Sequence, residues 1–145
     1  MERKRNEATL NRPEGDRVLD AAYVFIDIDD YIRQLREEDA WQKSDRNGIT
    51  VYKTDQVTMV VVGLHEKAIL KNNVIDGIVT MQVFEGRIRV TTPEGDIELK
   101  PNQIVTFHRC IDHSVEALDE SVLLLTNNTT KRENLDDGDD SSQIL

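Results

Sequence analysis

The chain has 145 residues, enough for one domain with a substantial core, and a formal net charge of -10 from 28 acidic and 18 basic residues. This excess of acid opposes non-specific binding to nucleic acid, which depends on lysine and arginine neutralising phosphates. The single cysteine, Cys110, excludes an intramolecular disulfide. No apolar run approaches the roughly 20 residues of a membrane-spanning helix. We therefore expect a cytoplasmic protein that binds neither nucleic acid nor membrane.

The first segment of the chain carries no sign of regular structure. Residues 1–19 mix both charge signs around Pro13 and Gly15 and show no apolar period. Such a segment buries too little apolar surface to order itself. We expect residues 1–19 to be flexible, or loosely draped over the rest of the domain.

Residues 20–48 are predicted to form a strand and helix lead-in. Asp27 is a good N-cap residue, and the apolar residues that follow it recur on one face of a helix. This amphipathic helix is expected to pass Trp41 and to end near residues 47–48, where Asn-Gly makes a plausible left-handed cap. One such helix on a β protein would cover an open end or edge of a sheet.

Residues 49–128 alternate between short β-rich runs and turn residues. In most runs apolar and polar residues alternate, as in strands with one buried face, while valines at 60, 61 and 62 indicate a strand buried on both faces. Turn chemistry separates the runs, for example at residues 85–86 and 92–95. The predicted strands are 49–53, 57–64, 68–71, 78–84, 87–91, 96–100, 104–107, 113–117 and 121–126. This spacing indicates an all-β sandwich or small barrel.

The end of the chain, residues 129–145, forms a segment of different composition. Acidic residues dominate it, with glycine and serines between them. A run of this kind buries too little apolar surface to order itself, so we expect a disordered acidic tail.

The stretch from Gly77 to Leu125 resembles a cupin. The likeness rests on the hairpin sequence TMQVFEGRIRV (residues 80–90) and on GDIELKPNQIVTFHRCIDHSV (residues 95–115). A strand that ends in Glu-Gly, and a later turn toward a histidine, recur throughout that family. The resemblance implies a cupin-like (jelly-roll) β-barrel, here with one N-terminal amphipathic helix. It also implies a homodimer, because cupins often pair through their sheets.

Cupin enzymes typically hold a divalent metal, and this chain departs from that pattern. The family's first motif supplies a His-x-His pair and a glutamate, and its second motif supplies one more histidine. The glutamate position falls on Val79, and the His-x-His pair falls on Asn73 and Ile75, or on residues 72 and 74 with the longer spacing. Only the last histidine is kept, as His113. In the second motif, the opening glycine falls on residue 102 and the glycine of Pro-x-Gly on residue 110.

These replacements argue against the usual metal site. A catalytic zinc or iron ion needs about three protein ligands with nitrogen, sulfur or charged oxygen donors. Valine and isoleucine have no donor atom, and a neutral amide is a poor ligand for such metals. We therefore expect no metal, no other cofactor and no catalytic residue.

His113 is the first candidate for a binding residue. It alternates with Val115 and Ala117, so it should point into the barrel mouth, where cupins keep their ligands. A buried neutral imidazole there could orient a small polar ligand, or it could simply satisfy a hydrogen bond at the barrel end. Gln82 either lines the cavity or faces solvent, and the sequence leaves that choice open. The predicted ligand-binding residues are His113, Gln82, Thr80, Lys71, Asn73 and His108.

The sequence thus predicts a small-molecule-binding or regulatory barrel that lacks the usual metal site and is not catalytic. Two alternatives remain open. One is a metal-dependent cupin enzyme, of dioxygenase or isomerase type, with non-standard ligands. The other is a structural homodimer with a filled barrel. Fold alone does not decide between them, because one barrel hosts many chemistries.

Overall fold

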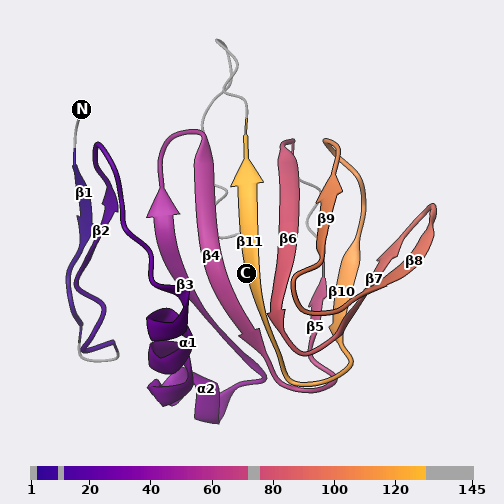
Figure 1. Ribbon diagram of the computed structural model, residues 1–145, viewed down its shortest axis with the longest axis horizontal. Helices are drawn as coiled ribbons and strands as arrows, with labels where there is room; N and C mark the ends of the chain where they lie inside the picture. The colour runs from indigo at the N-terminus through magenta and orange to yellow at the C-terminus, as the bar shows by residue number, and fades with distance from the viewer. Residues whose placement is uncertain (1–2, 10–11, 72–75, 130–145) are drawn as a thin grey trace.

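The computed structural model describes residues 3–9, 12–71 and 76–129, and two antiparallel sheets dominate it (Figure 1). The larger sheet contains, in order, β3 (Arg46–Lys53), β4 (Val57–Leu64), β11 (Ser121–Asn128), β6 (Ile78–Glu85) and β9 (Ile104–Phe107). The smaller sheet contains β5 (Ile69–Lys71), β10 (Ser114–Ala117), β7 (Ile88–Thr92) and β8 (Gly95–Leu99). The sheets pack over a shared apolar interior, which confirms the predicted all-β jelly-roll barrel.

The strand pattern follows the predicted alternation closely. β4 and β9 have the predicted bounds, and β4 pairs with β3 on one side and β11 on the other. Val60 and Val62 face the barrel interior, whereas Val61 belongs to a second apolar cluster on the outer face of the sheet. Three consecutive valines are therefore all buried because both faces of this central strand are covered.

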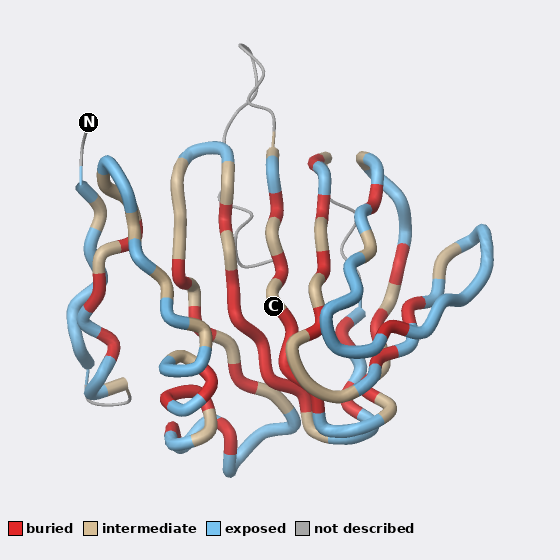
Figure 2. Tube along the Cα trace, viewed as in Figure 1, coloured by how far each residue is buried: buried red, intermediate tan, exposed pale blue. Residues whose placement is uncertain are grey.

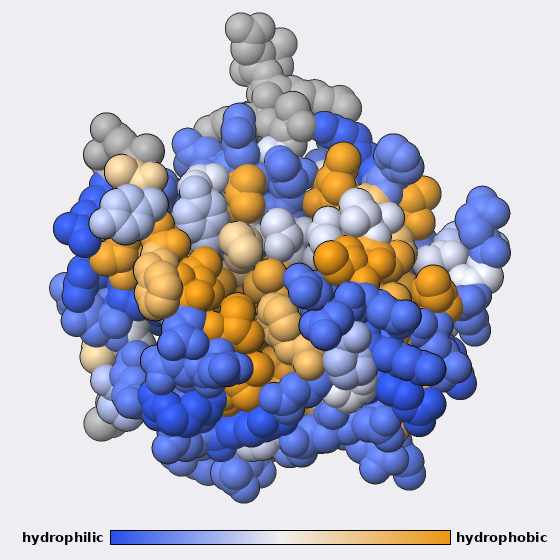
Figure 3. All heavy atoms as spheres, in the orientation of Figure 1, coloured by the Kyte–Doolittle hydropathy of each residue, from blue (hydrophilic) through white to orange (hydrophobic). Residues whose placement is uncertain are grey.

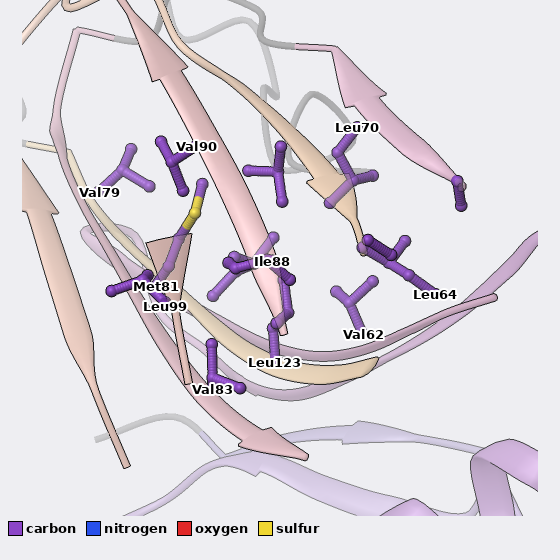
Figure 4. Packing of buried hydrophobic residues seen from close by; sticks show 14 of the residues in the cluster. Val62, Leu64, Leu70, Val79, Met81, Val83, Ile88, Val90, Leu99 and Leu123 are labelled. Carbon is purple, nitrogen blue, oxygen red and sulfur yellow. The ribbon is translucent and has the colours of Figure 1, made fainter. Parts of the chain in front are cut away.

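The barrel interior is filled by buried side chains from both sheets (Figure 4), and buried residues recur along the strands of both sheets (Figure 2). The larger sheet contributes Val60, Val62, Leu64, Val79, Met81, Val83, Phe107, Leu123 and Leu125, and the smaller sheet contributes Leu70, Ile88, Val90, Leu99, Val115 and Ala117. Burying each large aliphatic side chain contributes about 1.5–3 kcal/mol relative to leaving it exposed. This interior is the main source of stability of the domain.

The outer face of the larger sheet is partly covered by α1 (Ile28–Glu37) and α2 (Asp39–Lys43). Asp27 caps α1 as predicted, because its side chain accepts a hydrogen bond from the Asp30 amide at 3.3 Å. Leu35 and Trp41 pack against the sheet in the second cluster. The helices thus cover one part of this face and leave the rest of it open (Figure 1).

The predicted helix end near residues 47–48 is wrong. α1 ends at Glu37, and residues 47 and 48 lie in β3, where they pair with Gly63 and Val62. Pairing along the full length of β4 outweighs the local preference of Asn-Gly for a helix cap. Asn47 nevertheless satisfies the helix end from the strand, since its side-chain amide donates to the Leu35 carbonyl at 2.9 Å.

The N-terminal segment also differs from the expectation of flexibility. It contains β1 (Lys4–Asn6) and β2 (Arg17–Asp20), which pair as a separate two-stranded sheet. Long-range polar contacts hold it: Arg12 donates to the Gly48 carbonyl at 2.9 Å, and Arg17 donates to the Thr50 carbonyl at 2.6 Å. These tertiary contacts leave no periodic trace in the sequence, so the pattern of residues 1–19 did not reveal them.

The β7–β8 hairpin projects from the smaller sheet with most of β8 exposed (Figure 2). Thr92 closes its turn, because its hydroxyl donates to the Gly95 carbonyl at 2.9 Å and accepts from the Glu94 amide at 3.1 Å. Within the described residues no helix is long and apolar enough to cross a membrane. The predicted tail, from residue 130 onward, lies outside the described residues.

Candidate functional site

His113 lies at one end of the barrel and is buried, with 9% of its surface exposed. It points inward as predicted, since its ring stacks on Phe107 with 4.2 Å between ring centroids and an interplanar angle of 5°. Its Nδ1 lies 2.9 Å from the Ile111 carbonyl oxygen. A carbonyl can only accept a hydrogen bond, so Nδ1 carries a proton, and in the tautomer with a single ring proton the lone pair is on Nε2.

Asn127 is a second polar side chain at this end of the barrel. It alternates along β11 with Leu123 and Leu125, which belong to the interior cluster, and it is only 4% exposed. Its Oδ1 is fully buried and has no hydrogen-bond partner within the described residues. A buried polar atom without a partner is rare in proteins and costs about 1–3 kcal/mol, so it calls for a physical explanation.

The strand register brings these groups to the same row of the sheet. Asn127 pairs with Thr58 of β4 on one side and with Val79 of β6 on the other. Val79 in turn pairs with Phe107 of β9, the ring on which His113 stacks. We call these five residues, Thr58, Asn127, Val79, Phe107 and His113, the barrel-end site. It combines an apolar wall with three polar side chains that can accept a hydrogen bond, those of Thr58, Asn127 and His113.

The residues of this site do not fit the metal of cupin enzymes. Val79, at the glutamate position, is a buried core residue without a donor atom, and His113 is the one histidine of the site. Among the described residues no group of three or more histidine, cysteine, aspartate or glutamate side chains is placed to hold a metal ion. Residues 72–75, where the His-x-His pair would fall, lie outside the described residues.

The backbone of the second motif is retained even though its glycines are replaced. Asn102 and Cys110, at the two glycine positions, have positive φ values of 70° and 60°. This left-handed conformation normally favours glycine, because a Cβ atom crowds the following carbonyl. The finding supports the alignment with the cupin motif and places His113 at the motif's histidine.

The structure separates Gln82 and Thr80 from His113. Both side chains alternate with Met81 and Val83, which fill the interior, so both face the outer side of the larger sheet. The Thr80 hydroxyl lies 3.3 Å from the Thr106 hydroxyl on that outer face. The structure therefore does not bring these two predicted ligand-binding residues together with His113.

The other predicted residues do not join the site either. Lys71 is exposed at the end of β5, where it pairs with Ser114. His108 is exposed beyond the end of β9, and the residue of this strand that contacts His113 is Phe107. Asn73 lies outside the described residues. Sequence reasoning missed Asn127, although extending the alternation of the last strand by one residue beyond 126 would have placed it inside the barrel.

Solved structures identify the fold. A cupin superfamily protein from Desulfitobacterium hafniense is similar at a TM-score of 0.57 and 12% identity, over 59% of this chain and 78% of that one. A conserved protein from Streptococcus pyogenes is similar at a TM-score of 0.62 and 13% identity, over 79% of this chain and 93% of that one. A cupin superfamily sugar phosphate isomerase from Silicibacter pomeroyi is similar at a TM-score of 0.52 and 16% identity, over 59% and 60%.

The chain therefore has the cupin fold, as its motifs indicated. No protein-family model matches the sequence, and no curated protein matches it. At these levels of identity the likeness establishes architecture only, and the role of the barrel has to be argued from its own side chains.

Proposed function

We propose that this protein is a metal-free, non-catalytic binding module whose barrel-end site takes a small neutral molecule. The observation that carries the proposal is the buried Oδ1 of Asn127, which has no partner within the described residues and lies in the same site as His113. A ligand hydroxyl or N–H group at this position would supply the missing hydrogen bond. The proposed role is recognition, because the described residues of the site include no carboxylate or cysteine and only one histidine.

The chemistry of the site defines the class of ligand. His113 Nε2 and Asn127 Oδ1 both present lone pairs, so they favour a molecule with hydrogen-bond donors and disfavour an anion. Phe107 and Val79 form an apolar wall beside them. We therefore expect a compact molecule with an apolar body and one or two hydroxyl or N–H groups.

A fragment screen tests this proposal. Neutral hydroxyl- and amide-bearing fragments would be added to ¹⁵N-labelled protein, and the resonances of Asn127 and His113 followed by NMR. We expect shifts at both residues, and each of His113→Leu and Asn127→Leu should weaken binding about tenfold, the equivalent of one lost hydrogen bond. Gln82→Leu, on the opposite face of β6, is the matched control and should bind normally. Hits that are indifferent to both leucine variants would contradict the proposal.

Metal analysis provides the test against the enzymatic alternative. The sugar phosphate isomerase from Silicibacter pomeroyi has the same fold, so catalysis must be tested for directly. Near-stoichiometric iron, manganese, nickel or zinc in the purified protein, lost in His113→Ala, would favour a metal-dependent enzyme. We expect no such metal, because the glutamate position holds Val79.

We also propose that the protein forms a homodimer through the open part of the larger sheet's outer face. Tyr23 and Phe25 are 84% and 82% exposed, and Ile104 of β9 is 56% exposed. Figure 3 shows apolar side chains gathered on this face beside the hydrophilic surface of the helices. A face with few charges can meet its own copy without opposing like charges, which matters for a chain of net charge -10.

Sedimentation velocity tests the dimer. Phe25→Ser combined with Ile104→Ser should shift the protein toward monomer, whereas Ile97→Ser, an equally drastic change at a residue 48% exposed on β8, should not. A monomeric parent protein would refute the dimer. A dimer that binds no fragment at all would instead favour the structural alternative with a filled barrel.

A further inference from the structure

A cleft separate from the barrel lies where the N-terminal segment meets the helices. Its volume is about 330 Å³, and its walls include Asn6, Glu7, Thr9, Arg12, Arg17 and Glu38. This volume is at the lower end of the range for small-molecule pockets, which is about 300–1,000 Å³. None of these residues belongs to the barrel-end site, so the two sites can be tested independently.

Arg17 is the unusual member of this cleft, because it is a cation with only 9% of its surface exposed. Its Nε donates to the Thr50 carbonyl at 2.6 Å, and its Nη1 donates to the Gly15 carbonyl at 2.7 Å. Both acceptors are neutral, and no described carboxylate forms an ion pair with Arg17. Within the described residues its Nη2 makes no hydrogen bond. Burial consequently lowers the pKa of the Arg17 guanidinium.

The buried Glu38 of the cleft is already paired with the half-buried Arg12. Arg12 Nε lies 2.9 Å from the Glu38 carboxylate, which also accepts hydrogen bonds from Asn47 and Gln34 at 3.0 Å each. Although burial alone would raise the pKa of Glu38, the hydrogen bonds from Asn47 and Gln34 and the charge of Arg12 hold that pKa below its ordinary value. Glu38 is therefore bonded to Arg12, and its charge reaches Arg17 only at longer range, without an ion pair between them among the described residues.

We propose that this cleft binds a small organic anion whose carboxylate or phosphate group pairs with Arg17. An oxyanion on Nη2 would neutralise the buried guanidinium and supply its missing acceptor. Asn6 and Thr9 lie in the same walls and offer further polar contacts, while the volume leaves room for an organic body beyond the anionic group. Glu7 is the one exposed carboxylate of the walls, and it weakens binding by repulsion.

Calorimetry at constant ionic strength tests this site with three probes: succinate, glycerol 3-phosphate and inorganic phosphate. We expect an organic anion to bind more tightly than inorganic phosphate. Tighter binding of succinate would identify a carboxylate as the preferred group, and tighter binding of glycerol 3-phosphate would identify a phosphate. Arg17→Lys keeps the charge but loses the planar fork, so affinity should fall about tenfold or more. Glu7→Gln should tighten binding. Arg89→Gln, which removes an exposed arginine of β7, and His113→Leu in the barrel should both leave it unchanged.

Two results would overturn the proposal. One is that none of the three probes binds the parent protein at millimolar concentration, or that inorganic phosphate binds as well as the organic anions. The other is that the affinity of the bound probe is the same in the parent protein, in Glu7→Gln and in Arg17→Lys. Arg17→Lys could fail to fold, because Arg17 also anchors Thr50. In that case the test is the affinity of Glu7→Gln, together with NMR shifts at Asn6 and Thr9 when the bound probe is added. Unchanged affinity and no shifts at these residues would then overturn the proposal.

Discussion

Two histidines of this protein are stacked on aromatic rings, but only one of them is fully engaged. His65 stacks on Trp41 at 3.6 Å, its Nε2 lies 2.8 Å from the Trp41 carbonyl oxygen, and its Nδ1 lies 3.7 Å from the Glu120 carboxylate. His113 stacks on Phe107 in the same manner, and its Nδ1 is bonded to the Ile111 carbonyl. Its Nε2 has no hydrogen-bond partner among the described residues.

The difference separates a structural histidine from a candidate binding histidine. His65 donates from Nε2 to the Trp41 carbonyl, and when its ring is protonated Nδ1 also pairs with the Glu120 carboxylate, so the ring ties α2 and the outer cluster to the end of β4. His113 has one bonded nitrogen and one without a partner among the described residues, and Asn127 in the same site also has an unpaired atom. In the barrel-end site, polar groups that stability alone would satisfy are left without a partner among the described residues, which is a frequent property of functional sites.

Removing the aromatic platforms should give the largest effects. Trp41→Ala and Phe107→Ala each delete a ring that is at least 94% buried, so each should cost about 3–5 kcal/mol of unfolding free energy, measured with urea. The two variants should then diverge, because only Phe107→Ala should also weaken fragment binding at the barrel end. Equal loss of binding in both variants would remove the distinction between the two histidines.

Acid should lower the unfolding free energy through the buried carboxylate of Glu38, which lies on the same side of the molecule as Trp41. Its pKa is held below its ordinary value of 4.5, so its stabilising contribution is complete above that pH and is lost as the pH falls through the lowered pKa. Glu38→Gln should cost about 1–3 kcal/mol at neutral pH, since it breaks the pair with Arg12. The variant should also lose less stability than the parent protein as the pH falls below about 5, because it lacks the carboxylate that becomes protonated there. A parallel pH profile in both proteins would contradict this assignment.

Replacing each histidine with leucine tests the comparison directly. His65→Leu removes two polar contacts and should lower the unfolding free energy by about 1–2 kcal/mol. His113→Leu places an apolar side chain beside Phe107, so stability should change by less than about 1 kcal/mol while fragment binding is lost. Thermal or urea unfolding of both variants measures the difference, and the reverse order of stability would make His113 the structural residue.

The smallest effect is expected in the loop that leads to His113. Cys110 adopts φ of 60°, so Cys110→Gly should raise the unfolding free energy by about 0.5–1 kcal/mol by relieving the left-handed strain. Asn102→Gly, at φ of 70°, should be nearly neutral, because asparagine tolerates this conformation better. Urea unfolding of the two glycine variants checks the order. A clear loss of stability in Cys110→Gly would show that its side chain makes a stabilising contact.

The sequence predicts this fold well where alternation and turns coincide, and poorly where long-range contacts decide. The valines at 60–62, the turn at 92–95 and the inward direction of His113 all follow from local pattern. The outward direction of Gln82 does not, because period-two alternation defines two faces without saying which one is interior. The pairing of β11 with β4 and β6 and the anchoring of Arg17 depend on residues distant in the chain, which no local window contains.

The candidate site was predictable only in part. Its histidine follows from the cupin motif, whereas Asn127 reaches the site through the register of β11 between β4 and β6. That register depends on the pairing of three strands that are far apart in sequence. Because the predicted last strand ended one residue before Asn127, the prediction did not include the buried side chain whose Oδ1 has no partner among the described residues.

The exposed strand β8 has a consequence for how copies of this protein meet in concentrated solution. It forms the border of the smaller sheet, so one row of its peptide groups is available to a strand from another molecule. Asp96 and Glu98 stand on this border, and a second β8 laid alongside would set carboxylate against carboxylate. The repulsion between these carboxylates therefore disfavours edge-to-edge pairing of β8 strands into fibres, and a β8 without these two charges would lose that protection.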